Sequence, residues 1–120
     1  MGWSLGTAAS VYLSDNRPTK GTILIAPINS MFSRCQSYVP FIPLSIVMKE
    51  KFDSISRAPS INTPLLCLIG DLDINVSPSS SMKLVRKWKG DSTVKTYKGY
   101  DHFLMFHNNK CWEDIKLFLS

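Results

Sequence analysis

Apolar residues gather in blocks along the chain, and three of these blocks are typical of β-strands. Residues 22–27, TILIAP, form a continuous apolar run that ends in a proline. Such a run suits a strand that is buried on both faces. Residues 64–70, PLLCLIG, form a second run of this kind with Pro64 at its first position, where a strand tolerates proline. Residues 92–99, STVKTYKG, alternate in polarity and predict a third strand.

Helical patterns separate and follow these strands. Residues 5–13 are small or apolar and predict a short helix, and residues 77–90 predict a capped helix with serines at its start and a glycine after it. Residues 108–120 predict a closing helix. The expected core positions are Met82, Val85 and Trp88 in the middle helix and Trp112, Ile115, Phe118 and Leu119 in the last one.

Strands that alternate with helices indicate a parallel α/β sheet. The chain has 120 residues and is expected to form part of one domain, with about three parallel strands, flanking helices and a helical insert at about residues 29–62. The most apolar window, Tyr38–Met48, is shorter than the ~20 residues of a membrane span and contains two prolines. The chain start has no signal-peptide pattern.

Composition narrows the function classes. The chain has three cysteines, Cys35, Cys67 and Cys111, and no C-x-x-C pair. An odd number without such a pair argues against a disulfide framework or a zinc site. Cys67 is expected to be a buried free thiol. The net charge of +5 is densest between Lys83 and Lys98. That run is compatible with nucleic acid or an anionic membrane, but a solvated helix face followed by a strand is favoured, because no nucleic-acid motif accompanies it.

Three candidate catalytic residues stand at the expected ends of structural elements. Ser4 is the serine of Gly2-Trp3-Ser4-Leu5-Gly6, a G-x-S-x-G that fits a strand-to-helix turn, although only Met1 precedes it. Asp73 follows the second strand and His102 follows the third. Because the carboxyl ends of parallel strands share one edge of a sheet, we expect these side chains to meet there.

Each residue suits one role in nucleophilic catalysis. Ser4 is the candidate nucleophile, His102 the base that takes its proton, and Asp73 the carboxylate that orients the imidazole. The Leu5 N–H is the candidate oxyanion donor. Each of these features also has an ordinary explanation when it is taken alone. The G-x-S-x-G can be a chance match, Asp73 can be a turn residue, and His102 can be a loop histidine without a catalytic role. His107 is a weaker base candidate and is expected at the surface.

The glycines and the residues beside Ser4 carry further expectations. Gly2 and Gly6 are expected to leave room for a tight turn and for close helix–strand packing. Trp3 and Leu5 flank Ser4, where they either shape an acyl pocket or simply pack.

The order Ser, Asp, His resembles that of the α/β-hydrolase superfamily serine hydrolases. The segments GWSLGTA, LIAPINS, KFDSISRAPSINTPLLCLIGDLDINVSP and YKGYDHFLMF are similar to the nucleophile elbow, the next strand, the acid loop and the histidine loop of that family. The likeness is strongest to the serine aminopeptidase and acyl-protein thioesterase-like branch. In the family pattern, Gly70, Val76 and Pro78 frame the acid, which favours Asp73 over Asp71.

The resemblance implies hydrolysis of an ester, thioester or amide in a small-molecule, acyl or peptide substrate. It implies no cofactor, no metal and no nucleic acid, and a cytoplasmic location, with a peripheral membrane contact left open. The chain corresponds to the C-terminal half of the family domain, so a truncated enzyme is expected whose activity needs the N-terminal half. Without the preceding strands, residues 22–26 would form an apolar sheet edge that favours aggregation. The alternative is a catalytically inactive remnant or interaction module.

Overall fold

A parallel β-sheet forms the centre of the chain in a computed structural model that describes residues 1–28, 36, 38, 40, 41 and 53–120. Among these residues the sheet has four strands in the order β1-β2-β3-β4, and every neighbouring pair is parallel. The strands are β1 (Gly2–Trp3), β2 (Thr22–Ile25), β3 (Leu65–Gly70) and β4 (Ser92–Tyr97). All four therefore direct their carboxyl ends to the same edge.

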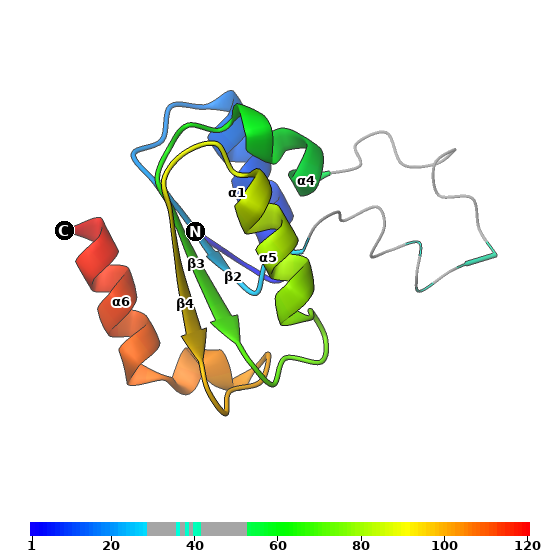
Figure 1. Ribbon diagram of the computed structural model, residues 1–120, viewed down its shortest axis with the longest axis vertical. Coiled ribbons are helices and arrows are strands. Elements are labelled where there is room, and N and C mark those ends of the chain that lie inside the picture. Colours follow the sequence, from blue (N-terminus) through cyan, green and yellow to red (C-terminus); the bar gives the residue numbers. More distant parts are fainter. Residues whose placement is uncertain (29–35, 37, 39, 42–52) are drawn as a thin grey trace.

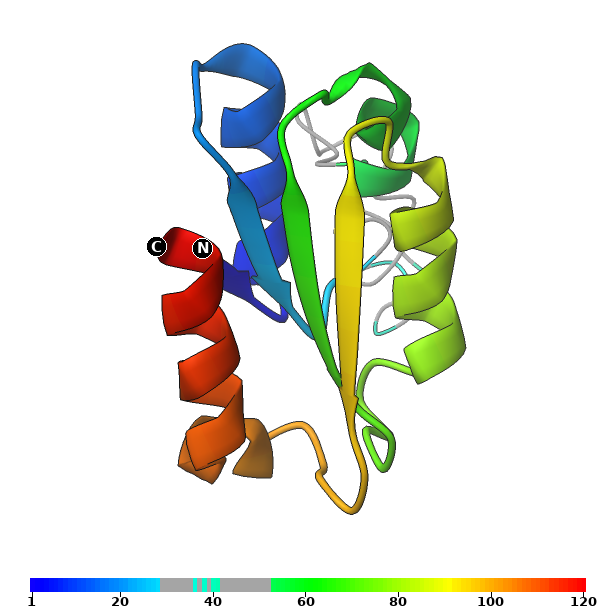
Figure 2. The same ribbon diagram turned by 60° about the vertical axis from the view of Figure 1, so that its left-hand side comes forward.

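Helices cover both faces of this sheet (Figures 1 and 2). One face carries α1 (Gly6–Asn16), α4 (Ser54–Arg57) and α5 (Pro78–Lys87). The other face carries α6 (Asn109–Leu119). Two short 3₁₀ helices, η1 (Ala58–Ser60) and η2 (Leu104–His107), complete the order of elements.

The central strands are buried on both faces, as their continuous apolar runs predict. Leu24 and Cys67 pack toward α1 and α5, and Ile25 and Leu68 pack toward α6, because successive side chains of a strand point to opposite faces. Alternation along β2 and β3 thus supplies two hydrophobic cores from one sheet.

The core positions of α5 are confirmed, whereas those of α6 are partly wrong. Val85 and Trp88 are buried, and the half-buried Met82 packs against the same core. In α6, Ile115 is buried, but Leu119 is 70% exposed and Asp114 is buried instead. The Tyr97 hydroxyl donates a hydrogen bond to Asp114 Oδ2 at 2.6 Å. This contact with β4 explains why a polar residue lies on the inner face of α6, and burial together with the neighbouring carboxylate raises the pKa of Tyr97.

The correction to the remaining α6 positions follows from the same orientation of the helix. Trp112 is 37% exposed, and Cys111 takes an inner position. Phe118 is half-buried and packs against the core on the α6 face.

A fourth strand, β1, is the main departure from the predicted sheet. The sequence predicts about three strands, with residues 22–26 as an unpaired edge. In the structure Gly2 pairs with Leu24 and Trp3 with Ile25, so β1 covers the second half of β2. Two residues are too few to show a sequence pattern, and only the pairing defines this strand.

Part of the predicted insert lies outside the described residues. Of residues 29–62, the structure describes α4 and η1, while Cys35 and most of the window Tyr38–Met48 fall outside. No helix in the described part of the chain is both long enough and apolar enough to cross a membrane.

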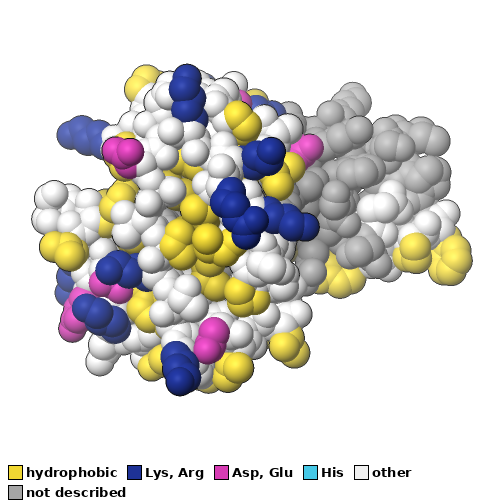
Figure 3. Space-filling view, viewed as in Figure 1, with side chains coloured by type: hydrophobic (Ala, Val, Ile, Leu, Met, Phe, Trp, Pro, Cys, Tyr) yellow, Lys and Arg dark blue, Asp and Glu magenta, His cyan; other side chains and the backbone are white. Residues whose placement is uncertain are grey.

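Cys67 and the basic run between Lys83 and Lys98 differ in their exposure to solvent. Cys67 is a buried free thiol, and burial raises its pKa to about 12. The cationic residues between Lys83 and Lys98 are exposed, and a dark-blue group gathers over α5 (Figure 3).

Candidate active site

The turn between β1 and α1 holds Ser4 in a conformation that is uncommon for a residue with a side chain. Ser4 has a φ of 51°, in the left-handed region. Its N–H donates to the Ile25 carbonyl at 2.9 Å, which extends the pairing of β1 with β2 by one hydrogen bond. Such strained residues cluster at functional sites, where the surrounding structure fixes them.

Gly2 allows strand and helix to approach closely on either side of this turn. A Cβ atom at Gly2 would collide with Ser10 Oγ and would lie 2.5 Å from the Gly6 carbonyl oxygen. The expectation for Gly2 is therefore confirmed. For Gly6 it is wrong, because a Cβ there would have no neighbour within 4 Å.

Thr7 ties the turn to the rest of the sheet edge, a role that no sequence pattern indicates. Its buried Oγ1 donates to the Ser4 carbonyl at 2.5 Å and accepts from the Ile28 N–H at 3.2 Å. The Thr7 N–H also donates to the Ser4 carbonyl, at 3.0 Å. A threonine in the first turn of a helix is too common to be recognised as functional from sequence.

The loop after β3 builds a buried acid. Asp73 Oδ1 accepts hydrogen bonds from the N–H groups of Asn75 at 2.9 Å and Val76 at 2.8 Å. Its Oδ2 lies 2.8 Å from His102 Nδ1, and only 4% of Asp73 is exposed. Asp71 is exposed and accepts from the Gly99 N–H at 2.7 Å. The loop thus directs Asp73, not Asp71, to the histidine.

His102 is enclosed by aromatic side chains. Only 4% of the residue is exposed. The Trp3 indole stacks on its ring with centroids 5.1 Å apart and planes inclined by 30°. Phe103 meets the ring edge-on at 5.3 Å. The backbone beyond is fixed by Asp101 Oδ1, which accepts from the N–H groups of Phe103 and Leu104.

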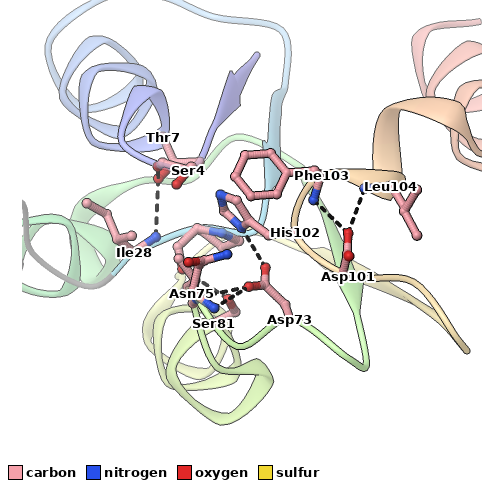
Figure 4. A network of polar contacts seen from close by, with 12 residues as sticks. Ser4, Thr7, Ile28, Asp73, Asn75, Ser81, Asp101, His102, Phe103 and Leu104 are labelled. Atoms are coloured by element: carbon pink, nitrogen blue, oxygen red, sulfur yellow. Dashed lines mark hydrogen bonds and ion pairs between the residues drawn. The ribbon is translucent and has the colours of Figure 1, made fainter.

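The structure brings the three sequence candidates to one edge of the sheet. Figure 4 shows the His102 ring between the Asp73 carboxylate and the Ser4 turn. No hydrogen bond joins the Ser4 hydroxyl to His102, both of which lie within the described residues. His107 is exposed on η2, as predicted.

A cavity of about 410 Å³ opens directly beside the serine. It is lined by Trp3, Ser4, Leu5 and Gly6. The Leu5 N–H, at the start of α1, donates to no group among the described residues. An unpaired N–H at a helix start favours negative charge nearby. The arrangement can therefore hold a substrate carbonyl between a hydroxyl and an N–H donor.

Comparison with known families identifies the chain. The family described as Serine hydrolase (FSH1) matches residues 1–107. The chain belongs to this serine hydrolase family. The match spans Ser4, Asp73 and His102. The more specific branch expected from sequence stays a prediction.

Curated relatives of this serine hydrolase are longer than the chain. Two proteins of Mycobacterium tuberculosis, from strains H37Rv and CDC 1551 and both described as uncharacterized, are 32% identical to it over 84 residues. The match covers 70% of this chain and 30% of each relative, so the matched segment spans less than a third of their length.

Solved structures share the fold of the serine hydrolase at low identity. An acetyl xylan esterase from Paenibacillus sp. R4 has a TM-score of 0.69 at 22% identity, over 98% of this chain and 44% of the esterase. A monoacylglycerol lipase from Paleococcus ferrophilus has a TM-score of 0.68 at 19% identity, over 98% and 64%. An esterase from Pyrococcus furiosus has a TM-score of 0.73 at 16% identity, over 98% and 51%. The predicted partial α/β-hydrolase fold is confirmed.

Proposed function

We propose that this serine hydrolase cleaves an ester, thioester or amide through an acyl-enzyme formed on Ser4, with His102 as the base and Asp73 as its orienting carboxylate. The observation that carries the proposal is the buried 2.8 Å contact between Asp73 Oδ2 and His102 Nδ1 at the sheet edge that also holds the strained Ser4 turn. A carboxylate on Nδ1 holds an imidazole in one orientation and one tautomer.

The first half of the reaction forms the acyl-enzyme. Ser4 Oγ attacks the substrate carbonyl carbon while His102 Nε2 takes the hydroxyl proton, which leaves a tetrahedral oxyanion and an imidazolium. His102 then returns the proton to the departing oxygen, sulfur or nitrogen as its bond to carbon breaks. Water repeats these steps on the acyl group and releases the acid and free Ser4.

Asp73 is suited to support this cycle. Its Oδ1 is fully engaged by two backbone N–H groups, so only Oδ2 is available to the imidazole. A carboxylate on Nδ1 fixes the tautomer in which Nε2 can accept the serine proton. In many enzymes the hydrogen bond between nucleophile and base tightens only when substrate binds.

The Leu5 N–H is the proposed donor to the oxyanion. It follows the nucleophile, lines the same cavity as Ser4, and donates to no other group among the described residues. An oxyanion hole needs two such donors, and the described residues suggest only this one. We therefore propose that the second donor lies outside the described residues, and that full activity needs the N-terminal half of the family domain.

The cavity beside Ser4 favours an apolar acyl group. Its lining includes Leu5, which is 47% exposed. Burial of apolar acyl surface against the Leu5 side chain contributes about 25 cal/mol per Å². The alternative of a catalytically inactive remnant would not require the Asp73–His102 pair to be buried and oriented.

The test is labelling with a fluorophosphonate probe, which reacts only with an activated serine. The wild-type chain should be labelled at Ser4, Ser4→Ala should give none, and His102→Ala should be labelled much more slowly. Ser79→Ala, which changes an exposed serine of α5, is the matched control and should label normally. Equal labelling of the wild type and Ser4→Ala would disprove the nucleophile assignment. If only a longer product of the gene is labelled, and Ser4→Ala abolishes that labelling, Ser4 is the nucleophile and its machinery extends beyond this chain.

A further inference from the structure

Trp3 lies against the imidazole of His102, although one residue ends β1 and the other follows β4. The two rings are stacked, with centroids 5.1 Å apart and planes inclined by 30°. Trp3 also immediately precedes Ser4. The Trp3 indole therefore connects the turn that carries Ser4 to the imidazole of His102, the proposed base.

The hydrogen bond to Asp73 would by itself leave one motion of the His102 ring free. Asp73 holds Nδ1 through a single hydrogen bond of 2.8 Å, and Phe103 touches the ring edge-on. A hydrogen bond at one ring nitrogen fixes the position of that atom but allows the ring to tilt about the bond. A flat indole face on the imidazole opposes this tilt, because stacked rings prefer a narrow range of mutual orientations.

The indole is itself held by aromatic neighbours. Phe106 meets it edge-to-face, with centroids 4.8 Å apart and planes inclined by 81°, and Phe103 meets it at 6.0 Å and 70°. Trp3 Nε1 is buried without a hydrogen-bond acceptor among the described residues. A buried N–H without a partner lowers stability, and phenylalanine would avoid this cost. Trp3 thus acts through its aromatic face.

We propose that Trp3 is a positioning residue for His102. Its indole face fixes the tilt of the imidazole toward Ser4, and it stabilises the imidazolium that forms when the ring takes the serine proton, because an aromatic face attracts a cation. The inference rests on the proposed function, since it assigns His102 as the base. Trp3 acts on the reacting atoms only through His102.

The first experiment measures the order of the His102 ring without reference to activity. The chain has two histidines, so protein labelled with ¹³C at the imidazole Cε1 gives two resonances, and the exposed His107 serves as the internal reference. Wild type and Trp3→Phe should each show one sharp His102 resonance. Trp3→Leu should show a broadened or split one. Trp112→Leu, which also changes an indole packed on Phe106, is the matched control and should resemble wild type.

A second variant covers the case in which Trp3→Leu does not fold. Phe106→Leu removes the edge-to-face support of Trp3, and Phe106 makes no ring contact with His102 among the described residues. It should broaden the His102 resonance to a smaller extent. A sharp, single His102 resonance in every folded variant, or a broad one in the wild type, would overturn the proposal.

The second experiment separates positioning from substrate binding. With an activated acetyl ester, Trp3→Leu should lower kcat by about 10- to 100-fold, the range expected when a catalytic group is misplaced, with KM changed less than threefold. Trp3→Phe should stay within about threefold of wild type. A loss seen only in KM would make Trp3 a wall of the cavity and overturn the inference. If Ser4→Ala keeps its activity, the proposed function fails, whereas full kcat in Trp3→Leu beside an inactive Ser4→Ala overturns only the role of Trp3.

Discussion

The two halves of the candidate site follow strands that are paired over very different lengths. The acid–base half, Asp73 and His102, follows β3 and β4, which pair over six positions. The nucleophile half follows β1, which pairs with β2 over two positions. Asp73 and His102 are each 4% exposed, whereas Ser4 is only partly buried.

This difference shows how each half keeps its geometry. The acid–base half is fixed by long strands and by hydrogen bonds that use both carboxylate oxygens of Asp73. The nucleophile half is fixed by local constraints, the close approach at Gly2 and the hydrogen bonds of Thr7. Changes in the first half should therefore affect chemistry more than stability, and changes in the second should affect both.

The largest expected effect separates the two aspartates of the acid–base half. Asp73→Asn keeps the shape of the side chain but favours the wrong imidazole tautomer, so kcat should fall by about 10⁴-fold. Asp71→Asn is the matched control, because its amide oxygen still accepts from the Gly99 N–H, and its kcat should change less than about threefold. Ester hydrolysis by both variants is the measurement. A larger loss in Asp71→Asn would assign the acid to Asp71.

A smaller effect separates the two glycines of the nucleophile half. Gly2→Ala places a methyl group against Ser10 and the Gly6 carbonyl, so the free energy of unfolding should fall by about 2–3 kcal/mol. Gly6→Ala enters open space at the start of α1 and should change stability by less than about 1 kcal/mol, in the stabilising direction. Urea unfolding of both variants provides the values. Equal destabilisation would mean that the turn does not depend on close approach at Gly2.

The smallest effect concerns pH and the interior of β3. Burial raises the pKa of Cys67 to about 12 from its usual 9.0. The thiol ionises in the unfolded chain first, so its contribution to stability is complete below pH 9 and is lost as pH rises toward 12. At pH 10 the wild type should have lost about 1.4 kcal/mol more than Cys67→Ala, relative to pH 8. Parallel stability curves for the two proteins would show that water reaches this strand.

Much of the fold could be predicted from sequence where the pattern is local. The runs that became β2 and β3 are continuous and apolar, so burial on both faces follows directly from their composition. The strand β1 could not be predicted, because two residues have no pattern of their own. The predicted inner face of α6 was partly wrong because Asp114 is buried through a long-range hydrogen bond from Tyr97, which the sequence pattern does not show.

In the candidate site, too, local features could be predicted from sequence and long-range contacts could not. Ser4, Asp73 and His102 could be proposed from their order and from their places after strands. The hydrogen bonds of Thr7 and the stacking of Trp3 on His102 join residues from different elements. Contacts of this kind arise only from the packed structure.

Two buried hydroxyl groups hold the main chain at the point where β2 gives way to residues 29–52. Thr7 Oγ1 accepts from the Ile28 N–H, and Ser81 Oγ donates to the Pro27 carbonyl at 3.0 Å. Thr7 Oγ1 also donates to the Ser4 carbonyl, so one side chain joins the Ser4 turn to the exit from β2. The main chain on these two sides of the site therefore cannot shift independently, and a displacement at residue 28 would be passed on to the nucleophile.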